Sequence, residues 1–429
     1  LPDPKCSLNE SGATVKIDGQ KGVGWMECCW PTEYLEHIRS VPQYLAEAGA
    51  GAMAMNDMEA VNRKILDRRR ASSDLPPYSA AKSEEIEEIL SGYFAKQKPG
   101  AKVSGVRRVG GGASKEQFFF TLSDSSGDEQ FLLRMDPRKA ITETDREREF
   151  VLIKAMQGIV PVPEPVWVDN DAEFFPQPAA IMRVVNGVTK PSDAGVKVSG
   201  LGTWLGPDLR GKLRDQFMDY LVKIHAWDWR AAALSGYEIP EADPRQAARW
   251  AYNYWYELWR IDEGENRPIF SLAEQWLADN MPDTAELVMI HGDYRTGNYL
   301  FDEDTGQITA LLDWELARIG DFHEDLAWVL MQVFGTMDPD GTFRASDLFE
   351  REEFITEYER RSGRTVNRRT LHYYDVMSSW KTLIIVAANG LAAARSQHNH
   401  QDVLLTFLGT TSPMFAADLV RLLSEDVSL

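Results

Sequence analysis

The sequence is poor in cysteine. Its three cysteines, Cys6, Cys28 and Cys29, all lie within the first thirty of 429 residues. Adjacent cysteines bridge poorly, and no metal-ligand spacing follows them. A disulfide scaffold and a cysteine zinc site are therefore excluded, and a reducing compartment is favoured.

Basic residues are also scarce relative to acidic ones. The chain has 46 Lys and Arg against 66 Asp and Glu, which gives a net charge of −20. A nucleic-acid binder needs a basic face to meet phosphates, so no nucleic-acid partner is expected. An ATP enzyme stays compatible with this charge, because Mg²⁺ and a few local cations can neutralise phosphates. The acidity would suit a cationic substrate, although acidic surfaces more often serve solubility.

Long apolar runs are missing as well. The longest, residues 383–394, is broken by Asn389 and Gly390 and is too short to span a bilayer. The N-terminus lacks a basic region followed by an apolar core, so no signal peptide is expected. We expect a soluble, cytoplasmic protein without a membrane partner. Its hydrophobic fraction of 44%, with 13 Trp and 18 Phe, is ample for large cores.

The most informative stretch is VMIHGDYRTGNYLF at residues 288–301, followed by ALLDWE at residues 310–315. The first apolar run predicts a short buried strand that leads into a loop carrying Asp293 and, five positions later, Asn298. A second short strand ends on Asp313. This order of parts is typical of enzymes that transfer the γ-phosphoryl group of ATP. A polar turn with solvated carboxylates is the alternative, and the predicted strand context disfavours it.

Each of these side chains suits one task in phosphoryl transfer. Asp293 is the candidate catalytic residue that orients and deprotonates the acceptor hydroxyl. Asn298 and Asp313 are the candidate metal ligands, because Mg²⁺ prefers hard oxygen donors.

These motifs resemble the aminoglycoside phosphotransferase (kinase-like) superfamily. Through residues 312–321 and the later Asp325-Leu-Ala-Trp328, the chain is similar to the branch whose domain is fused to acyl-CoA dehydrogenases in some animal proteins. The resemblance covers about residues 82–429. It implies an α+β, bilobal protein-kinase-like fold, with a small antiparallel-sheet N-lobe and a mostly helical C-lobe. It also implies ATP, Mg²⁺ and a small-molecule hydroxyl acceptor.

The N-lobe is predicted to begin with an amphipathic helix at residues 83–96, for which Ser83 is a plausible N-cap. A strand, a glycine-rich turn and a second strand follow. The turn holds the candidate phosphate-binding residues Gly110, Gly111, Gly112 and Ser114. Its backbone N–H groups could approach phosphates closely, although many glycine runs are only turns.

Arg134 ends the next predicted strand, where kinases carry a lysine that binds the α- and β-phosphates. An arginine keeps this role, because it stays charged and binds phosphate bidentately. A helix predicted over residues 142–156 offers Glu149 as the partner of Arg134, with Glu147 as the fallback. In the alternative interpretation both acids face solvent.

Residues 179–185 are predicted to lead to the hinge between the lobes, where Met182 and nearby backbone groups would meet the adenine ring. We divide the chain into an N-terminal extension (1–80), an N-lobe (81–185) and a helical C-lobe with the acceptor site (186–429). The extension could be an accessory segment, a dimerisation arm or a cap over the lobes. The oligomeric state stays open.

The predicted reaction is transfer of phosphate to the hydroxyl of a small molecule. Protein kinases carry Arg where this chain has Gly292, and no activation segment follows Asp313; both departures favour a small acceptor. The resemblance suggests a hydroxyacyl-CoA or a similar metabolite. An antibiotic kinase for aminoglycosides or macrolides is the alternative, although the many arginines of residues 350–429 do not favour a cationic acceptor. Sugars, choline and amino-alcohols stay open. A pseudokinase binding module is a third reading, which the three motif residues disfavour.

Overall fold

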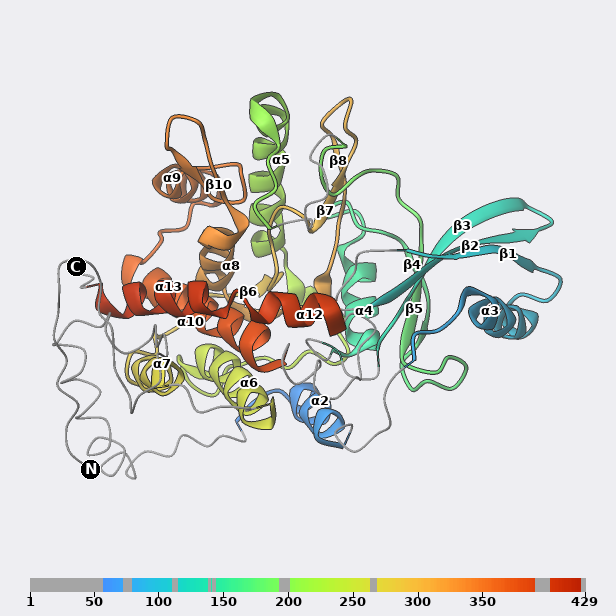
Figure 1. The fold of residues 1–429 in the computed structure, drawn as a ribbon, viewed down its shortest axis with the longest axis horizontal. Helices are drawn as coiled ribbons and strands as arrows, with labels where there is room; N and C mark the ends of the chain where they lie inside the picture. The colour runs from blue at the N-terminus through green and yellow to red at the C-terminus, as the bar shows by residue number, and fades with distance from the viewer. Residues whose placement is uncertain are drawn as a thin grey trace, which may run out of the picture. The chain divides into compact units, whose positions relative to one another are not determined.

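The structure, a computed structural model, describes residues 57–71, 79–109, 115–137, 140, 144–192, 201–262, 268–389 and 402–425. The glycine-rich turn at residues 110–114 lies outside the described residues. Residues from Asn56 onward form one unit, whose elements are labelled in Figure 1.

A five-stranded antiparallel sheet forms the N-terminal half of this unit, in the order β1-β2-β3-β5-β4. Its elements are α3 (Ser83–Gln97), β1 (Lys102–Arg108), β2 (Glu116–Asp124), β3 (Gly127–Met135), α4 (Arg146–Met156), β4 (Pro165–Asp169) and β5 (Ala179–Arg183). The predicted small antiparallel sheet is confirmed.

Alternation along the strands builds the core of the sheet. On β2, every second side chain from Glu116 to Leu122 is buried, and Phe118, Phe120 and Leu122 join Phe131, Leu133 and Met135 of β3 in one core with α3. The α3 side of this core includes Ile86, Leu90 and Phe94. Lys82 rather than Ser83 is the N-cap of α3, and its backbone amide donates a hydrogen bond to the Glu85 carboxylate at 3.2 Å.

Helix α4 packs against β4 and β5 and begins later than predicted. Asp145 is its N-cap, and its side chain accepts a hydrogen bond from the amide of Arg148 at 2.9 Å. Because of this cap the helix begins at Arg146, four residues after the predicted start.

The C-terminal half is mostly helical (Figure 1). Its helices are α5 (Gly206–Ala226), α6 (Gln246–Asp262), α7 (Pro268–Asp279), α8 (Phe322–Val329), α9 (Arg351–Ser362), α10 (Arg368–Leu383), α12 (Asp402–Gly409) and α13 (Ser412–Ser424). Helix α8 ends at Val329 and is followed by a short 3₁₀ turn over Gln332–Phe334, and α12 and α13 are two separate helices.

Two short antiparallel ribbons lie between these helices and carry the motif residues. One pairs β6 (Leu287–Ile290) with β9 (Arg318–Asp321), and the other pairs β7 (Tyr299–Phe301) with β8 (Ile308–Leu311). A third ribbon, β10 (Thr336–Met337) with β11 (Phe343–Arg344), lies further along the chain. The first two ribbons bring the loop after β6 next to the end of β8.

Residues 57–71, here called the α2 segment, contain helix α2 (Ala60–Ala71), which packs on α6. Arg69 is fully buried, and it bonds Asp262 of α6 at 3.0 Å and the carbonyl of Ala140 at 2.8 Å. Arg148 of α4 reaches Glu59 at 3.0 Å. The α2 segment thus contacts both α4 and α6. No described helix combines the length and the hydrophobicity that crossing a membrane requires.

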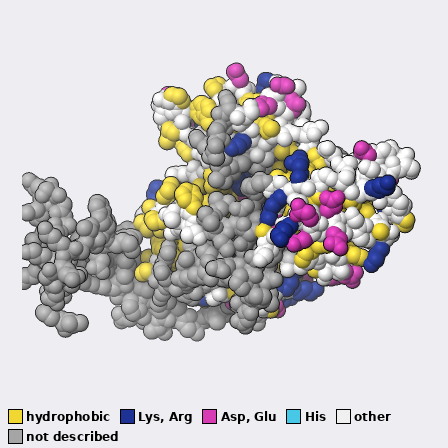
Figure 2. All heavy atoms as spheres, turned by 45° about the vertical axis from the view of Figure 1, so that its right-hand side comes forward, with side chains coloured by type: hydrophobic (Ala, Val, Ile, Leu, Met, Phe, Trp, Pro, Cys, Tyr) yellow, Lys and Arg dark blue, Asp and Glu magenta, His cyan; other side chains and the backbone are white. Residues whose placement is uncertain are grey.

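Acidic and basic side chains are intermixed on the face shown in Figure 2, which carries the sheet and α3. Within the sheet region, Arg183 of β5 pairs with both Glu129 and Glu164 at 2.7 Å. On this face the described residues form no continuous basic surface of the kind that nucleic acid requires.

Candidate active site

The loop after β6 turns sharply at Gly292. This residue has φ +79°, and a Cβ added there would lie 2.5 Å from the carbonyl oxygen of Leu316. Both the backbone conformation and the space therefore require glycine. The turn carries Asp293 away from the buried strand β6 to a position where its side chain is 18% exposed.

Asp325 of α8 holds this turn from behind. Its two carboxylate oxygens accept hydrogen bonds from the amides of His291 at 2.7 Å and Gly292 at 2.8 Å. Burial by itself would raise the pKa of Asp325, but hydrogen bonding by His225 and the loop holds that pKa below its ordinary value. His225 also bonds Tyr358 at 2.8 Å, so both of its ring nitrogens have partners in the core.

The Asp293 carboxylate accepts hydrogen bonds from three side chains. Trp328 Nε1 donates to Oδ1 at 2.6 Å, and Arg295 Nε donates to the same oxygen at 2.8 Å. Asn298 Nδ2 donates to Oδ2 at 2.6 Å. These donors fix the direction of the carboxylate, which is what a general base needs.

Asn298 and Asp313 come from adjacent strand ends. The amide of Leu312 donates to the carbonyl of Asn298 at 2.8 Å, so Asp313 follows directly beside it. Because Nδ2 of Asn298 faces Asp293, its Oδ1 is left as a hard ligand. The described residues hold no cluster of three or more His, Cys, Asp or Glu side chains able to bind a metal. Two protein ligands completed by phosphate and water oxygens are what Mg²⁺ favours, so these residues fit that ion.

Asp313 has left-handed backbone angles, φ 58° and ψ 56°. Such a conformation costs a non-glycine residue about 1–3 kcal/mol and is concentrated at functional sites. Its carboxylate accepts a hydrogen bond from Arg134 Nη2. The strained backbone therefore aims the carboxylate at the sheet.

The structure brings Arg134 and Glu149 together. Arg134 Nη1 donates to Glu149 at 2.9 Å, and the fallback partner Glu147 is exposed. Burial would lower the pKa of Arg134, but Glu149 and Asp313 raise it above its ordinary value, so the side chain stays charged. Arg134 thus links α4 to the loop after β8.

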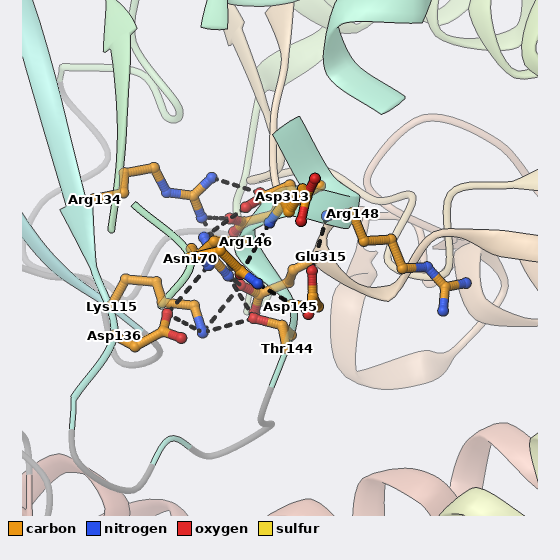
Figure 3. A network of polar contacts seen from close by, with 12 residues as sticks. Lys115, Arg134, Asp136, Thr144, Asp145, Arg146, Arg148, Asn170, Asp313 and Glu315 are labelled. Carbon is orange, nitrogen blue, oxygen red and sulfur yellow. Dashed lines mark hydrogen bonds and ion pairs between the residues drawn. The ribbon is translucent and has the colours of Figure 1, made fainter. Parts of the chain in front are cut away.

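A wider network of buried charges surrounds this pair, as Figure 3 shows. Lys115 lies 3.1 Å from Asp136 and 3.5 Å from Glu315. Arg146 lies 3.2 Å from the same two carboxylates. Burial alone would raise the pKa of Asp136, but Arg146 and Lys115 outweigh it and lower that pKa. No local pattern in the sequence indicates that these residues are buried and paired, because isolated charges in a sequence resemble surface positions.

The remaining predicted nucleotide contacts are only partly described. Gly110, Gly111, Gly112 and Ser114 lie outside the described residues. Met182 is buried on β5. The amides of Arg183 and Val184 already donate to Glu164 and Gln130 at 2.9 and 3.1 Å. A backbone N–H that meets an adenine ring would therefore come from Val185 or a later residue.

A cavity of about 50 Å³ lies between the α2 segment, α6 and β9. Its wall includes Trp250, Tyr254 and Trp255 of α6 together with Lys381 of α10. This volume holds a few water molecules and is far below the ~300 Å³ of a typical ligand pocket. The aromatic helix α6 thus packs in the core and also lines a small cavity.

Lys381 and Trp328 are site residues for which the sequence analysis assigned no role. Lys381 Nζ donates to the carbonyl of Gly292 at 2.9 Å, across 89 positions of sequence. The stretch around Trp328 carried part of the family resemblance, but nothing in its spacing indicated a bond to Asp293.

The chain is similar to known proteins. Residues 105–364, more than half of the chain, match the model of a phosphotransferase enzyme family. Acyl-CoA dehydrogenase family member 11 of Gallus gallus is 27% identical over 300 residues, 66% of this chain and 36% of that protein. Family member 10 of Mus musculus is 27% identical over 229 residues, 52% of this chain and 20% of that protein. The matched region thus spans well under half of these relatives.

A solved structure shares the fold. It is a thermostable mutant of aminoglycoside phosphotransferase APH(4)-Ia, in a ternary complex with ADP and hygromycin B. The TM-score is 0.53 at 15% identity, over 80% of this chain and 99% of that one. The predicted bilobal kinase-like fold is confirmed.

Proposed function

This chain belongs to the phosphotransferase enzyme family, and from that premise we propose that it transfers the γ-phosphoryl group of ATP to a hydroxyl of a small molecule. One observation carries the proposal. Asn298 is bonded to Asp293 and lies beside Asp313, and Arg134 from the sheet is bonded to Asp313. Phosphoryl transfer uses these residue types in these positions.

In the proposed reaction, Asp293 accepts the proton of the acceptor hydroxyl as that oxygen attacks the γ-phosphorus. The bond from this phosphorus to the β–γ bridging oxygen breaks, and ADP is the leaving group. Its three hydrogen-bond donors keep the carboxylate directed at one position. Arg134, fixed by Glu149, binds phosphate oxygens together with the loop at residues 110–114. Mg²⁺ bound by Asn298 and Asp313 would neutralise the charge on the β- and γ-phosphates.

The proposed domains separate nucleotide binding from acceptor binding and catalysis. Residues 81–185, with Met182 at their end, would hold the nucleotide, and residues 186–429 would supply the catalytic loop and the acceptor site. The α2 segment bonds both parts, through Arg148 on one side and Asp262 on the other.

For the acceptor we propose a hydroxyacyl-CoA or a related hydroxylated metabolite. The support is the similarity to proteins named acyl-CoA dehydrogenase family members 10 and 11. Those proteins are about three to five times longer than the matched region, so their names support the acceptor class only indirectly.

An antibiotic kinase is the second candidate, because the structural neighbour was solved with hygromycin B. A polycationic antibiotic needs acids that are free to bind it. In the described part of the tail, several acids are instead paired with arginines, as in the pairs Arg351–Asp375, Arg368–Glu352 and Arg421–Asp418. These pairs favour an acceptor without several positive charges.

The test is ADP release from Mg-ATP across a panel of hydroxyacyl-CoAs, aminoglycosides, macrolides, sugars and amino-alcohols. Asp293→Asn should lower acceptor-dependent turnover by about 10²–10⁴-fold, because the carboxamide cannot accept the proton. Mg-ATP should still bind to this variant with nearly the wild-type Kd. Asp304→Asn, at an exposed position between β7 and β8, is the matched control and should behave as wild type.

Three outcomes separate the candidates. Turnover with one acceptor class would establish both the reaction and the substrate class. A wild-type rate in Asp293→Asn would remove Asp293 from its role. Failure of the wild-type chain to bind Mg-ATP would overturn the kinase proposal and leave a binding module.

A further inference from the structure

Lys381, near the end of α10, is a lysine in the interior of the protein. It is 3% exposed. Its Nζ lies 3.9 Å from the centre of the Trp328 ring of α8 and 5.3 Å from that of Trp255 of α6. The same atom donates a hydrogen bond to the carbonyl of Gly292 at 2.9 Å. The ammonium group therefore lies among two aromatic faces and the backbone of the loop that carries Asp293.

This surrounding is unusual for a buried charge. Buried ions are normally paired with an opposite charge at short range. Among the described residues, Lys381 forms no ion pair within 4 Å, and the rings and the carbonyl stabilise it instead. Burying an ammonium group without a charged partner costs free energy that a well-packed apolar side chain of similar size does not. Stability alone therefore gives little reason for a lysine at this position.

The contacts of Lys381 lead to Asp293 by two routes. The first runs through Trp328, since the ring that faces Lys381 donates its Nε1–H to Asp293 Oδ1 at 2.6 Å. The second runs through Gly292, whose carbonyl precedes Asp293 in the chain. Lys381 thus restrains both the backbone and a hydrogen-bond donor of the same carboxylate.

We propose that Lys381 is a positioning residue for Asp293, which holds the Trp328 ring and the Gly292 carbonyl so that the carboxylate faces the acceptor hydroxyl. This inference rests on the proposed function, in which Asp293 accepts the hydroxyl proton. Without the ammonium group the Trp328 ring loses its cation–π contact and the loop loses a backbone restraint. A shift of about 1 Å at a reacting group can lower a rate by about 10²-fold.

The variants that test the proposal separate charge, ring and hydrogen bond. Lys381→Met removes the charge and keeps a long apolar side chain. Lys381→Arg keeps the charge. Trp328→Phe keeps a ring against Lys381 and removes the N–H donor to Asp293. Lys223→Met is the matched control, because Lys223 is exposed and lies over the ring of Tyr220.

In the active enzyme, Lys381→Met should lower kcat by about 10- to 100-fold, while the KM for Mg-ATP stays within about twofold. Trp328→Phe should lower kcat to a similar degree. Lys381→Arg should recover part of the loss, and Lys223→Met should match the wild type. Equal kcat in wild type and Lys381→Met would overturn the proposal, as would a loss that falls only on the KM for ATP.

The pH profile gives a second reading. Burial lowers the pKa of Lys381 from its ordinary value. Glu324 and Asp325 of α8 and Asp293 of the loop oppose this shift, and Arg318 of β9 adds to it, while α6 presents uncharged rings. Because the protonated form is the active one, wild-type kcat should fall at a pH below the range of an ordinary lysine. Lys381→Arg should lack this fall, and an identical alkaline limb in both proteins would contradict the assignment.

An NMR measurement that does not depend on turnover tests the role of Lys381 separately from the proposed function. The indole N–H resonance of Trp328, assigned by its loss in Trp328→Phe, should be shifted downfield and exchange slowly in the ¹⁵N-labelled wild-type chain. In Lys381→Met the chemical shift of this resonance should change, and the indole N–H should exchange with solvent faster. If the wild type phosphorylates no acceptor, the proposed function fails and this resonance still decides the positioning. An unchanged resonance in Lys381→Met overturns the positioning, whatever the activity.

Discussion

At the scale of residues, the site is held together by charges that are buried and matched. Arg134 joins Glu149 and Asp313, and only the second of these carboxylates is substantially exposed. Removing one member of a buried pair leaves the other charge without compensation, which is more costly than never having had the pair. The guanidinium group is therefore a structural link between these carboxylates, and in the proposed reaction it also binds phosphate.

Arg134→Met should consequently affect both stability and nucleotide binding. We expect the free energy of unfolding to fall by less than the ~3–5 kcal/mol of an uncompensated buried charge, because Glu149 loses Arg134 but keeps its buried ion pair with Arg146 at 2.5 Å. The KM for Mg-ATP should rise, whereas Arg134→Lys should restore part of both properties. Urea unfolding and initial rates measure the two effects. An unchanged unfolding midpoint in Arg134→Met would show that the pair contributes little.

Residues close in sequence were the ones that sequence reasoning could assign. Asp293, Asn298 and Asp313 are linked by short strands, so their meeting follows from the chain itself. Lys381 belongs to a helix far along the chain, and no local pattern indicates that it reaches Gly292. Arg146 and Lys115 were missed for a related reason, because a charge is predicted to face solvent until its partner is known.

At the scale of elements, regular sequence patterns predicted which helices and strands exist better than they predicted where those elements begin and end. The strand β2 after the glycine-rich turn and the apolar stripe of α3 are both present as expected. Helix α4 starts at Arg146 and α8 stops at Val329, because an aspartate cap and a short 3₁₀ turn decide those ends locally. The α2 segment had no predicted partner, yet Arg69 and Asp262 form a pair in which both side chains are fully buried.

Arg69→Met should loosen the α2 segment from α6. We expect a loss of about 3–5 kcal/mol in unfolding free energy, because the substitution removes one partner of the buried Arg69–Asp262 ion pair. Lys64→Met, at an exposed position of the same helix, should change stability by less than about 0.5 kcal/mol. Hydrogen exchange of the α2 amides should accelerate in Arg69→Met alone. Equal exchange in both variants would mean that other contacts hold the helix.

At the scale of the whole molecule, nucleotide and metal should stabilise the fold together. A ligand that binds the folded chain alone adds about 2.7 kcal/mol at a hundred times its Kd. Mg-ATP should therefore raise the melting temperature, and chelation of Mg²⁺ should remove most of that gain. Thermal unfolding with ATP, with and without a chelator, measures it. The same gain in both conditions would exclude Asn298 and Asp313 as metal ligands.

The turn at Gly292 has a consequence for how such an enzyme can be controlled. Protein kinases order their activation loops by phosphorylation, through new pairs between arginine and the phosphorylated residue. Here an arginine beside the catalytic aspartate would need a left-handed backbone and would meet the carbonyl of Leu316. A single substitution cannot supply that arginine without displacing the loop. Phosphorylation therefore cannot order this loop through an arginine at position 292.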